Sequence, residues 1–314
     1  MILVTGGTGF IGRVLIRHLV ENGYQVRTLI RPSPRSPNLP RGVSVDVAVS
    51  SLNDERGLRA AMVGIDTVFH LASAERGGPR ADLMHVDIQG TRAVAEAASD
   101  AGVERLFYLS HLGADRASAY AVLKSKAIAE EFVRRSGLDY TVVRTALVFG
   151  VDDGFTTSLA QILSSLPFLF LLPGDGSTLL QPLWVEDLAT CLVWSLENPE
   201  MRKRTIDIGG AEYLSLRQVI EAIMAEINTR RVILGIPPPY LRGLTVILHA
   251  MFPHLPVSAY WLDYLAANRT TALDTLPRVF NLMPARLSQQ LAYLRGQSWR
   301  SSLLRLLLDR QKQP

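Results

Sequence analysis

The sequence predicts an α/β fold, in which a doubly wound parallel sheet is joined to a smaller and mostly helical C-terminal region. Apolar runs of strand length alternate with helical patterns over the first two thirds of the 314 residues, which is typical of a parallel sheet with crossover helices. A glycine-rich turn at 6–12 separates the first run from the first helical pattern. Apolar residues make up 48% of the chain and charged residues 20%, so the protein is large and apolar enough for one substantial core.

The predicted elements follow one another in an order that suits a parallel sheet. Strands are expected at the short apolar runs 2–5, 25–30, 43–49, 67–71, 105–110, 140–146 and 205–208. Helices are expected where apolar residues recur every three or four positions, at 13–21, 55–62, 87–100 and 125–135. We assign 1–235 to this first domain, with an insertion at about 151–180, and 236–314 to a helical, basic extension that begins at the proline run 237–239.

The glycine-rich turn has the residues of a phosphate-binding loop. Its glycines lie at a spacing of three and three, directly after a strand and before a helix. Backbone N–H groups at a helix start can face an anion, and the missing side chains let a pyrophosphate approach the backbone. We therefore expect a Rossmann-like, dinucleotide-binding domain with cofactor contacts at Gly6, Thr8, Gly9, Phe10, Ile11 and Gly12.

The end of the second strand indicates which dinucleotide is bound. In such sheets this position meets the adenosine ribose, and an acid there would accept hydrogen bonds from a free 2′-hydroxyl. The chain instead carries Arg31, with Arg35 close behind and no acid nearby. Because the forked donors of arginine suit a phosphate, the sequence favours NADP, with NAD as the alternative.

Composition argues against several other classes of function. The single cysteine, Cys191, excludes an internal disulfide, and a strand at residue 2 leaves no room for a signal peptide, so we expect a cytoplasmic protein. The six histidines lack metal-ligand spacing, and we expect no metal site. Basic residues are not interleaved with aromatic ones, so nucleic acid is not an expected partner.

Taken together, these motifs resemble the extended and atypical branches of the short-chain dehydrogenase/reductase superfamily. The similarity includes NmrA-like regulators and the dehydrogenase-like accessory subunit of respiratory complex I. It covers roughly residues 1–230 and lies in the segments 5–12, 69–72, 86–91, 108–110, 140–144, 181–189 and 213–216. The resemblance implies that Leu71 and Ala72 line the cofactor and that Ser51 and Leu52 lie at the adenine.

The superfamily's reaction uses a serine to polarise the substrate carbonyl, a tyrosine as general acid or base, and a lysine four residues after the tyrosine. The resemblance implies that Ser110 is the serine. Tyr120 and Lys124 have the spacing of the other two and would share one face of a helix.

A second alignment selects a different lysine. In relatives a glutamate follows the lysine by four residues, and an arginine of the sixth strand follows the tyrosine by about twenty-two. Counting back from Glu130 and from Arg144 gives Lys126 as the lysine that holds the nicotinamide ribose and puts Val122 at the tyrosine position. Both alignments stay open here.

Two functions follow from these alternatives. The first is an NADP(H)-dependent oxidoreductase that acts on a hydrophobic carbonyl or isoprenoid-like substrate. The second is a weakly catalytic or non-catalytic nucleotide-binding sensor or accessory subunit of a membrane-associated complex. Asp87, which stands where extended members usually carry asparagine, and Ser51, which replaces an aspartate, make hydride transfer less assured.

Two further segments bear on partners. The apolar stretch 166–172 suggests a greasy substrate, a lipid or protein contact, or packing against the core. From Arg286 onward six basic residues stand against one acid, and a leucine-rich helix is expected over 299–310. That helix would bind a membrane surface or an acidic protein, or pack on the protein's own core. The protein is therefore expected to be cytoplasmic, with a peripheral association at the membrane as an alternative.

Overall fold

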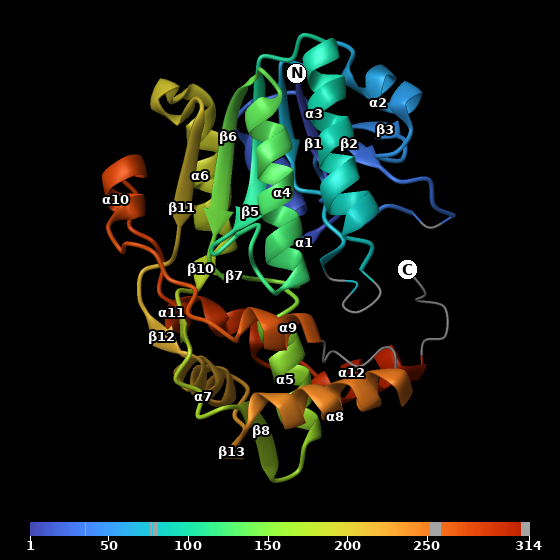
Figure 1. The fold of residues 1–314 in the computed structure, drawn as a ribbon. Coiled ribbons are helices and arrows are strands. Elements are labelled where there is room, and N and C mark those ends of the chain that lie inside the picture. Colours follow the sequence, from blue (N-terminus) through green and yellow to red (C-terminus); the bar gives the residue numbers. More distant parts are fainter. Residues whose placement is uncertain (35, 76, 78–80, 252–258, 309–314) are drawn as a thin grey trace.

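The computed structural model describes residues 1–34, 36–75, 77, 81–251 and 259–308 (Figure 1). Its centre is a seven-stranded sheet, all parallel, in the order β11-β6-β5-β4-β1-β2-β3. Its strands are β1 (Ile2–Thr5), β2 (Val26–Ile30), β3 (Asp46–Val49), β4 (Thr67–His70), β5 (Arg105–His111), β6 (Asp139–Thr145) and β11 (Arg204–Ile208). The strand order reverses between β1 and β4, and ligands bind at the carboxyl ends of strands at such a switch point.

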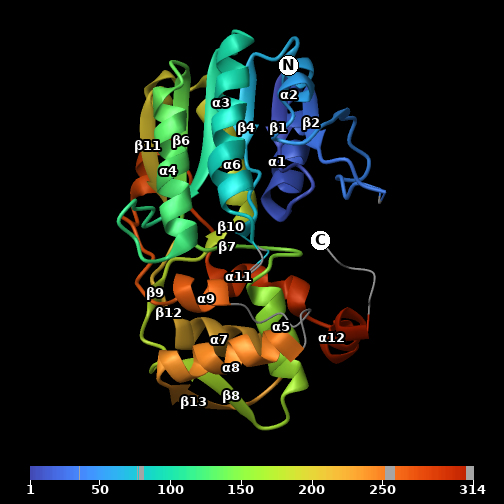
Figure 2. The same cartoon turned by 45° about the vertical axis from the view of Figure 1, so that its right-hand side comes forward.

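Helices cover both faces of the sheet (Figures 1 and 2). One face carries α1 (Phe10–Glu21) and α6 (Val185–Glu197), which pack against each other, and the 3-10 turn η3 (Pro199–Met201) follows α6. The other face carries α2 (Glu55–Met62), α3 (Gly90–Asp100) and α4 (Ala121–Arg135). Each face has its own apolar cluster of strand and helix side chains. The predicted fold class, a doubly wound parallel sheet, is confirmed.

The helix predicted at 87–100 begins differently in the structure. A π-helical segment, η2 (Met84–Gln89), precedes α3 and carries Asp87, whose side chain is fully buried. A π turn widens the helix by one residue and is frequent at functional sites. Here the π-helical segment lies beside the carboxyl edge of the sheet, where the cofactor is expected.

A second unit, with its own apolar cluster, lies beyond the carboxyl edge of the sheet (Figure 2). Its helices are α5 (Thr156–Ser165), α7 (Leu216–Glu226), α8 (Pro238–Met251), α9 (Ala259–Tyr264), α11 (Leu287–Gln290), η4 (Leu291–Leu294) and α12 (Trp299–Leu308), while α10 (Thr275–Phe280) packs on α6 and β11. Three two-stranded pairs complete it: β7 (Val148–Phe149) with β10 (Leu183–Trp184), β9 (Leu179–Leu180) with β12 (Leu214–Ser215), and β8 (Leu169–Pro173) with β13 (Val232–Ile236).

This second unit draws on more of the chain than the segment after residue 235. Both α7 and β13 belong to it, since side chains of α7 lie in its apolar cluster and β13 pairs with β8. The chain therefore crosses into the second unit before the proline run. Pro238 and Pro239 open α8, where the first turn tolerates proline because its N–H groups have no partner in the helix.

The C-terminal helix and the apolar stretch are both partly packed. Helix α12 lies against α5, with Leu303 buried and Ser302 hydrogen-bonded to Gln161 at 3.2 Å. In the stretch 166–172, Phe170 and Leu172 are buried while Phe168 is 79% exposed. Among the described residues no helix combines the length and the apolar character needed to cross a membrane.

Candidate cofactor and active site

A cavity of about 350 Å³ opens at the carboxyl ends of the central strands. The glycine turn after β1 forms one wall, and the ends of β2, β4 and β5 form others. All the expected cofactor residues line it: Gly6, Thr8, Gly9, Phe10, Ile11, Gly12, Arg31, Ser51, Leu52, Leu71, Ala72 and Lys126. A parallel sheet places these distant segments at one edge because all its strands end there.

Glycine is present at the three positions of the turn for different structural reasons. Gly6 has a φ of +74°, and a Cβ there would lie 2.7 Å from the carbonyl carbon of Leu71. A Cβ on Gly12 would lie 2.3 Å from the Gly6 carbonyl oxygen. A Cβ on Gly9 would meet only that same oxygen, at 3.2 Å. Gly6 and Gly12 are thus required by the turn itself, whereas at Gly9 the fold leaves almost enough room for a side chain.

The start of α1 is suited to a pyrophosphate. Gly9 is its N-cap and provides no side-chain hydrogen bond, and the first turn contains no acid. The first N–H groups of a helix have no acceptor within it, and the helix dipole favours an anion at this end. The residues present therefore fit a dinucleotide phosphate.

Arg31 lies one residue beyond the end of β2, is exposed, and lines the cavity. Ser51 and Leu52 follow β3 on the same side of the cavity. The other arginine expected near the ribose, Arg35, lies outside the described residues.

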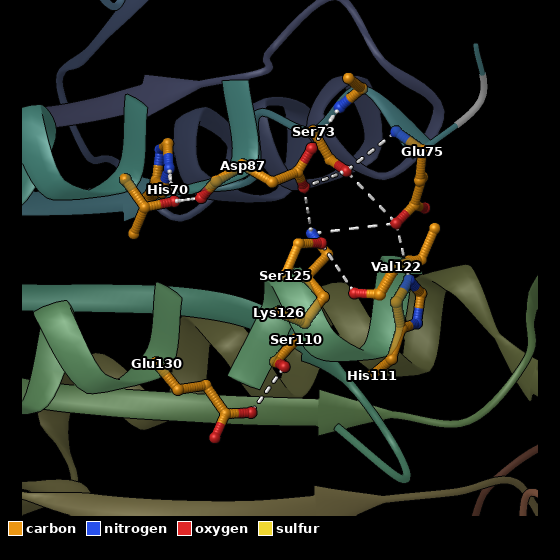
Figure 3. A network of polar contacts seen from close by, with 12 residues as sticks. His70, Ser73, Glu75, Asp87, Ser110, His111, Val122, Ser125, Lys126 and Glu130 are labelled. Atoms are coloured by element: carbon orange, nitrogen blue, oxygen red, sulfur yellow. Dashed lines mark hydrogen bonds and ion pairs between the residues drawn. The ribbon is translucent and has the colours of Figure 1, made fainter. Parts of the chain in front are cut away.

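A buried polar cluster occupies the opposite end of the cavity (Figure 3). The Nζ atom of Lys126 lies 3.2 Å from Oδ1 of Asp87 and 3.8 Å from Oε2 of Glu75. Burial by itself would lower the pKa of Lys126, but Tyr108 and the two carboxylates outweigh it and raise that pKa. These contacts favour the ammonium form of Lys126 at the cavity wall.

Ser73 supports this cluster from the loop after β4. Its hydroxyl donates to Oδ1 of Asp87 at 2.6 Å, and the backbone N–H of Ala74 donates to Oδ2 of Asp87 at 2.9 Å. With Lys126, these contacts give the buried carboxylate the partners it needs. The chain carried no sequence signal for Ser73 or Glu75, because both lie in an irregular loop whose course depends on its neighbours.

His111, the last residue of β5, also belongs to the cluster. Its Nε2 atom lies 2.7 Å from Oε2 of Glu75. Its other ring nitrogen, Nδ1, is buried and hydrogen-bonds to no described residue. His111 lines the cavity, and the ring of Tyr264 meets it edge-on with centroids 6.1 Å apart. It is a histidine that lines the cavity beside a carboxylate, with one ring nitrogen enclosed by the protein.

Ser110, the expected serine, lines the cavity but is already hydrogen-bonded within the protein. Its hydroxyl donates to Oε1 of Glu130 at 2.6 Å. Glu130 is fully buried and also accepts from Arg144 and Arg134. Burial would raise the pKa of Glu130, but the hydrogen bonds from Arg144 and Ser110 lower it overall. Ser110 thus joins α4 to β5 and β6 through a buried carboxylate.

The two candidate lysines lie in different environments. Lys126 is buried at the cavity, whereas Lys124 is exposed and does not line it. Tyr120 is the N-cap of α4 and lines a second cavity of about 330 Å³, together with Val122. The structure therefore brings Lys126 to the glycine turn and separates it from Tyr120 and Lys124. Tyr260 and Tyr264 line both cavities, so the two adjoin at α9.

The comparisons with known proteins agree with this geometry. A family model described as NAD(P)H-binding matches residues 6–160. Ceramide reductase of Caulobacter vibrioides is 31% identical over 199 residues, which are 63% of this chain and 62% of that protein. A putative dihydroflavonol 4-reductase of Synechocystis sp. is 33% identical over 261 residues, which are 75% of this chain and 73% of that protein. The chain belongs to the short-chain dehydrogenase/reductase superfamily.

Other members of the superfamily differ in their described roles. Subunit 9 of the NADH dehydrogenase [ubiquinone] 1 alpha subcomplex of Arabidopsis thaliana is 27% identical over 284 residues, which are 86% of this chain and 70% of that protein. The chain spans a little under two thirds of the ceramide reductase, at 62%. As a superfamily member with an NAD(P)H-binding match, the protein binds a nicotinamide dinucleotide, and the lined cavity is the site that fits it.

Solved structures support the fold. An NADPH-dependent quinone oxidoreductase of Escherichia coli, complexed with NADPH, superimposes with a TM-score of 0.71 at 17% identity and covers 94% of this chain and 99% of that chain. The UDP-glucose 4-epimerase of Thermotoga maritima gives a TM-score of 0.69 at 22% identity, covering 93% of this chain and 96% of that chain. At these identities the similarity concerns the fold alone.

Proposed function

We propose that the protein is an NADP(H)-dependent oxidoreductase that reduces a hydrophobic carbonyl substrate. The observation that carries this proposal is the cluster in which Lys126 and His111 both contact Glu75 at the wall of the cofactor cavity. One group is a buried lysine held between carboxylates, and the other is an imidazole that lines the cavity. For carbonyl reduction the protein has to provide two groups, a lysine that binds the ribose and a proton donor.

The bound cofactor would supply the hydride, which adds to the carbonyl carbon. Arg31 would pair with the 2′-phosphate through charge-assisted hydrogen bonds, and Lys126 would donate to the hydroxyls of the nicotinamide ribose. The carbonyl oxygen gains negative charge as the hydride arrives and must receive a proton.

We assign that proton to His111. As an imidazolium it would donate a proton to the substrate oxygen and become neutral, and water would then restore its proton. Because Nδ1 is enclosed by the protein and Nε2 contacts Glu75, the ring has to turn for this step. The carboxylate of Glu75, 2.7 Å from Nε2, fixes the orientation of the ring. His111 would thus replace the tyrosine, whose position in the alignment based on Glu130 and Arg144 is Val122.

The substrate would lie where the two cavities adjoin. Tyr260 and Tyr264 line both cavities there, and the first cavity adds the apolar and aromatic side chains of Leu147, Phe155 and Trp261. Such a lining favours a hydrophobic or aromatic carbonyl compound over a sugar nucleotide, which would need many polar partners. The reductase names of two relatives agree with this direction of reaction.

The test compares His111→Gln with Tyr120→Phe in the full-length protein. NADPH oxidation is followed with a panel of aromatic ketones, long-chain aldehydes and quinones. We expect His111→Gln to lower kcat by about 10²–10⁴-fold with little change in NADPH affinity, and Tyr120→Phe to retain activity. The reverse pattern would assign the proton to Tyr120 and overturn this mechanism.

One observation favours the second candidate function, a nucleotide-binding accessory or sensor protein. The hydroxyl of Ser110 is held by Glu130, so the usual serine is not directed at a substrate. The similarity to a subunit of NADH dehydrogenase agrees with such a role. NADPH binding by calorimetry, with no turnover of any panel compound by the wild type, would favour this function over the reductase.

A further inference from the structure

Helix α8 exposes a stripe of large apolar side chains. Tyr240, Leu244, Ile247 and Met251 recur at spacings of four, three and four, so they form one stripe along the helix. Tyr240 is 75% exposed, Ile247 59% and Met251 64%. The residue of α8 that is buried is Thr245. A helix that packs only on the core would bury such a stripe.

A second group of exposed apolar side chains lies on the strands that pack beside α8. Phe168 and Leu169 precede and begin β8, and Val232 and Leu234 lie on β13, which pairs with it. Helix α8 follows β13 directly and contacts β8. Single exposed apolar residues are ordinary, but several on neighbouring elements indicate an interaction surface. Figures 1 and 2 show β8, β13 and α8 together at the end of the molecule remote from the sheet.

The chain that builds this surface carries an excess of positive charge. Between Glu226 and Asp263 the sequence contains no acid but includes Arg230, Arg231 and Arg242. Arg242 pairs with Asp263 of α9, so Arg230 and Arg231 carry the excess. The stretch 166–174 that leads through β8 has no charged residue. Two copies of such a basic surface would repel each other, whereas a surface of anionic lipid headgroups would attract it.

We propose that α8 lies in the surface of an anionic lipid bilayer, with its stripe toward the acyl chains and with Arg230 and Arg231 at the headgroups. An exposed apolar stripe with flanking arginines is the form of an interfacial helix. It needs no membrane-spanning segment. The inference is independent of whether the protein turns over a substrate.

The test is vesicle flotation with the full-length protein, using phosphatidylcholine alone and an equal mixture of phosphatidylcholine and phosphatidylglycerol. We expect flotation with the mixed vesicles that weakens at high salt. The variant Ile247→Glu/Met251→Glu should reduce it by at least about tenfold. The matched control Val63→Glu/Met283→Glu adds the same charge at two exposed apolar side chains elsewhere and should float like the wild type.

A fluorescent label gives a second measurement that does not depend on added charge. The only cysteine of the sequence, Cys191, is buried. A polarity-sensitive dye on Ile247→Cys should therefore report from α8 and shift to the blue with the mixed vesicles, while the same dye on Val63→Cys should not.

Three outcomes would overturn the proposal. The first is a wild type that ignores the mixed vesicles. The second is an equal loss of flotation in both glutamate variants. The third is a wild type that forms dimers in the absence of lipid, which Ile247→Glu/Met251→Glu converts to monomers, with no dye shift on vesicles. That result would assign the stripe to a second copy of the chain.

Discussion

The ammonium of Lys126 lies 3.2 Å from the carboxylate of Asp87, and both side chains are buried at the carboxyl edge of the sheet. Lys126 comes from the second turn of α4, and Asp87 comes from the π segment before α3. Their contact joins two crossover segments at the wall of the cofactor cavity, so it affects both stability and ligand binding.

Removal of the lysine should destabilise the fold. Lys126→Met leaves the Asp87 carboxylate buried without its cation, which should lower the free energy of unfolding by about 3–5 kcal/mol. The double variant Asp87→Asn/Lys126→Met removes both charges and should recover a large part of that loss. Urea unfolding of the three proteins measures it. Equal stability of the single and double variants would mean that the charges do not interact.

The glycine turn should separate binding from folding. Gly9→Val points a side chain at the phosphate position and should abolish NADPH binding while the unfolding temperature changes little. Gly12→Val should reduce the yield of folded protein, because its Cβ overlaps the Gly6 carbonyl. Calorimetric titration and thermal unfolding decide this. Wild-type affinity in a folded Gly9→Val protein would argue against a phosphate at this turn.

Arg31 should set the choice of cofactor. If it pairs with the 2′-phosphate, Arg31→Ala should weaken NADPH binding by about 1.5–3 kcal/mol and leave NADH binding nearly unchanged. Titration of both cofactors into both proteins gives the comparison. An equal loss for NADPH and NADH would show that Arg31 only shapes the turn after β2.

His70 should make the fold sensitive to acid. The Thr91 hydroxyl donates to the Asp87 carbonyl oxygen, so His70 must donate to Thr91 from Nε2 and accept from Thr5 at Nδ1. This arrangement requires a neutral ring, and burial together with Lys126 lowers the pKa of His70 to about 3.

The sign of the pH effect follows from that pKa. The His70 ring is protonated more readily in the unfolded chain than in the folded protein. The stabilisation of the fold by the neutral ring is therefore complete above a pH of about 6.5 and is lost as the pH falls toward 3. Between pH 7 and pH 5 the wild type should lose about 2 kcal/mol more than His70→Gln, at about 1.4 kcal/mol per unit. Urea unfolding at several pH values measures the difference, and parallel curves would exclude His70 as the source.

Much of the fold could be predicted because its signals are local. The predicted helix at 55–62 has the same bounds as α2, and all seven strand predictions overlap strands of the sheet. The irregular loop that carries Ser73 and Glu75 had no such signal, since neither residue type nor periodicity indicates which way its side chains point. The packing of α12 on α5 also could not be predicted, because the same leucines could contact either the protein's own core or an external surface.

The sequence by itself determined the alternation of strands and helices, the glycine turn, and the arginine at the end of β2, because each depends on residues close together in the chain. Tertiary structure decided which lysine reaches the cavity. Lys124 and Lys126 are two residues apart, so they lie on nearly opposite sides of α4. The burial of Leu123, Ala127 and Glu130 against the sheet and its neighbouring helices fixes the rotation of α4, and that rotation turns Lys126 inward.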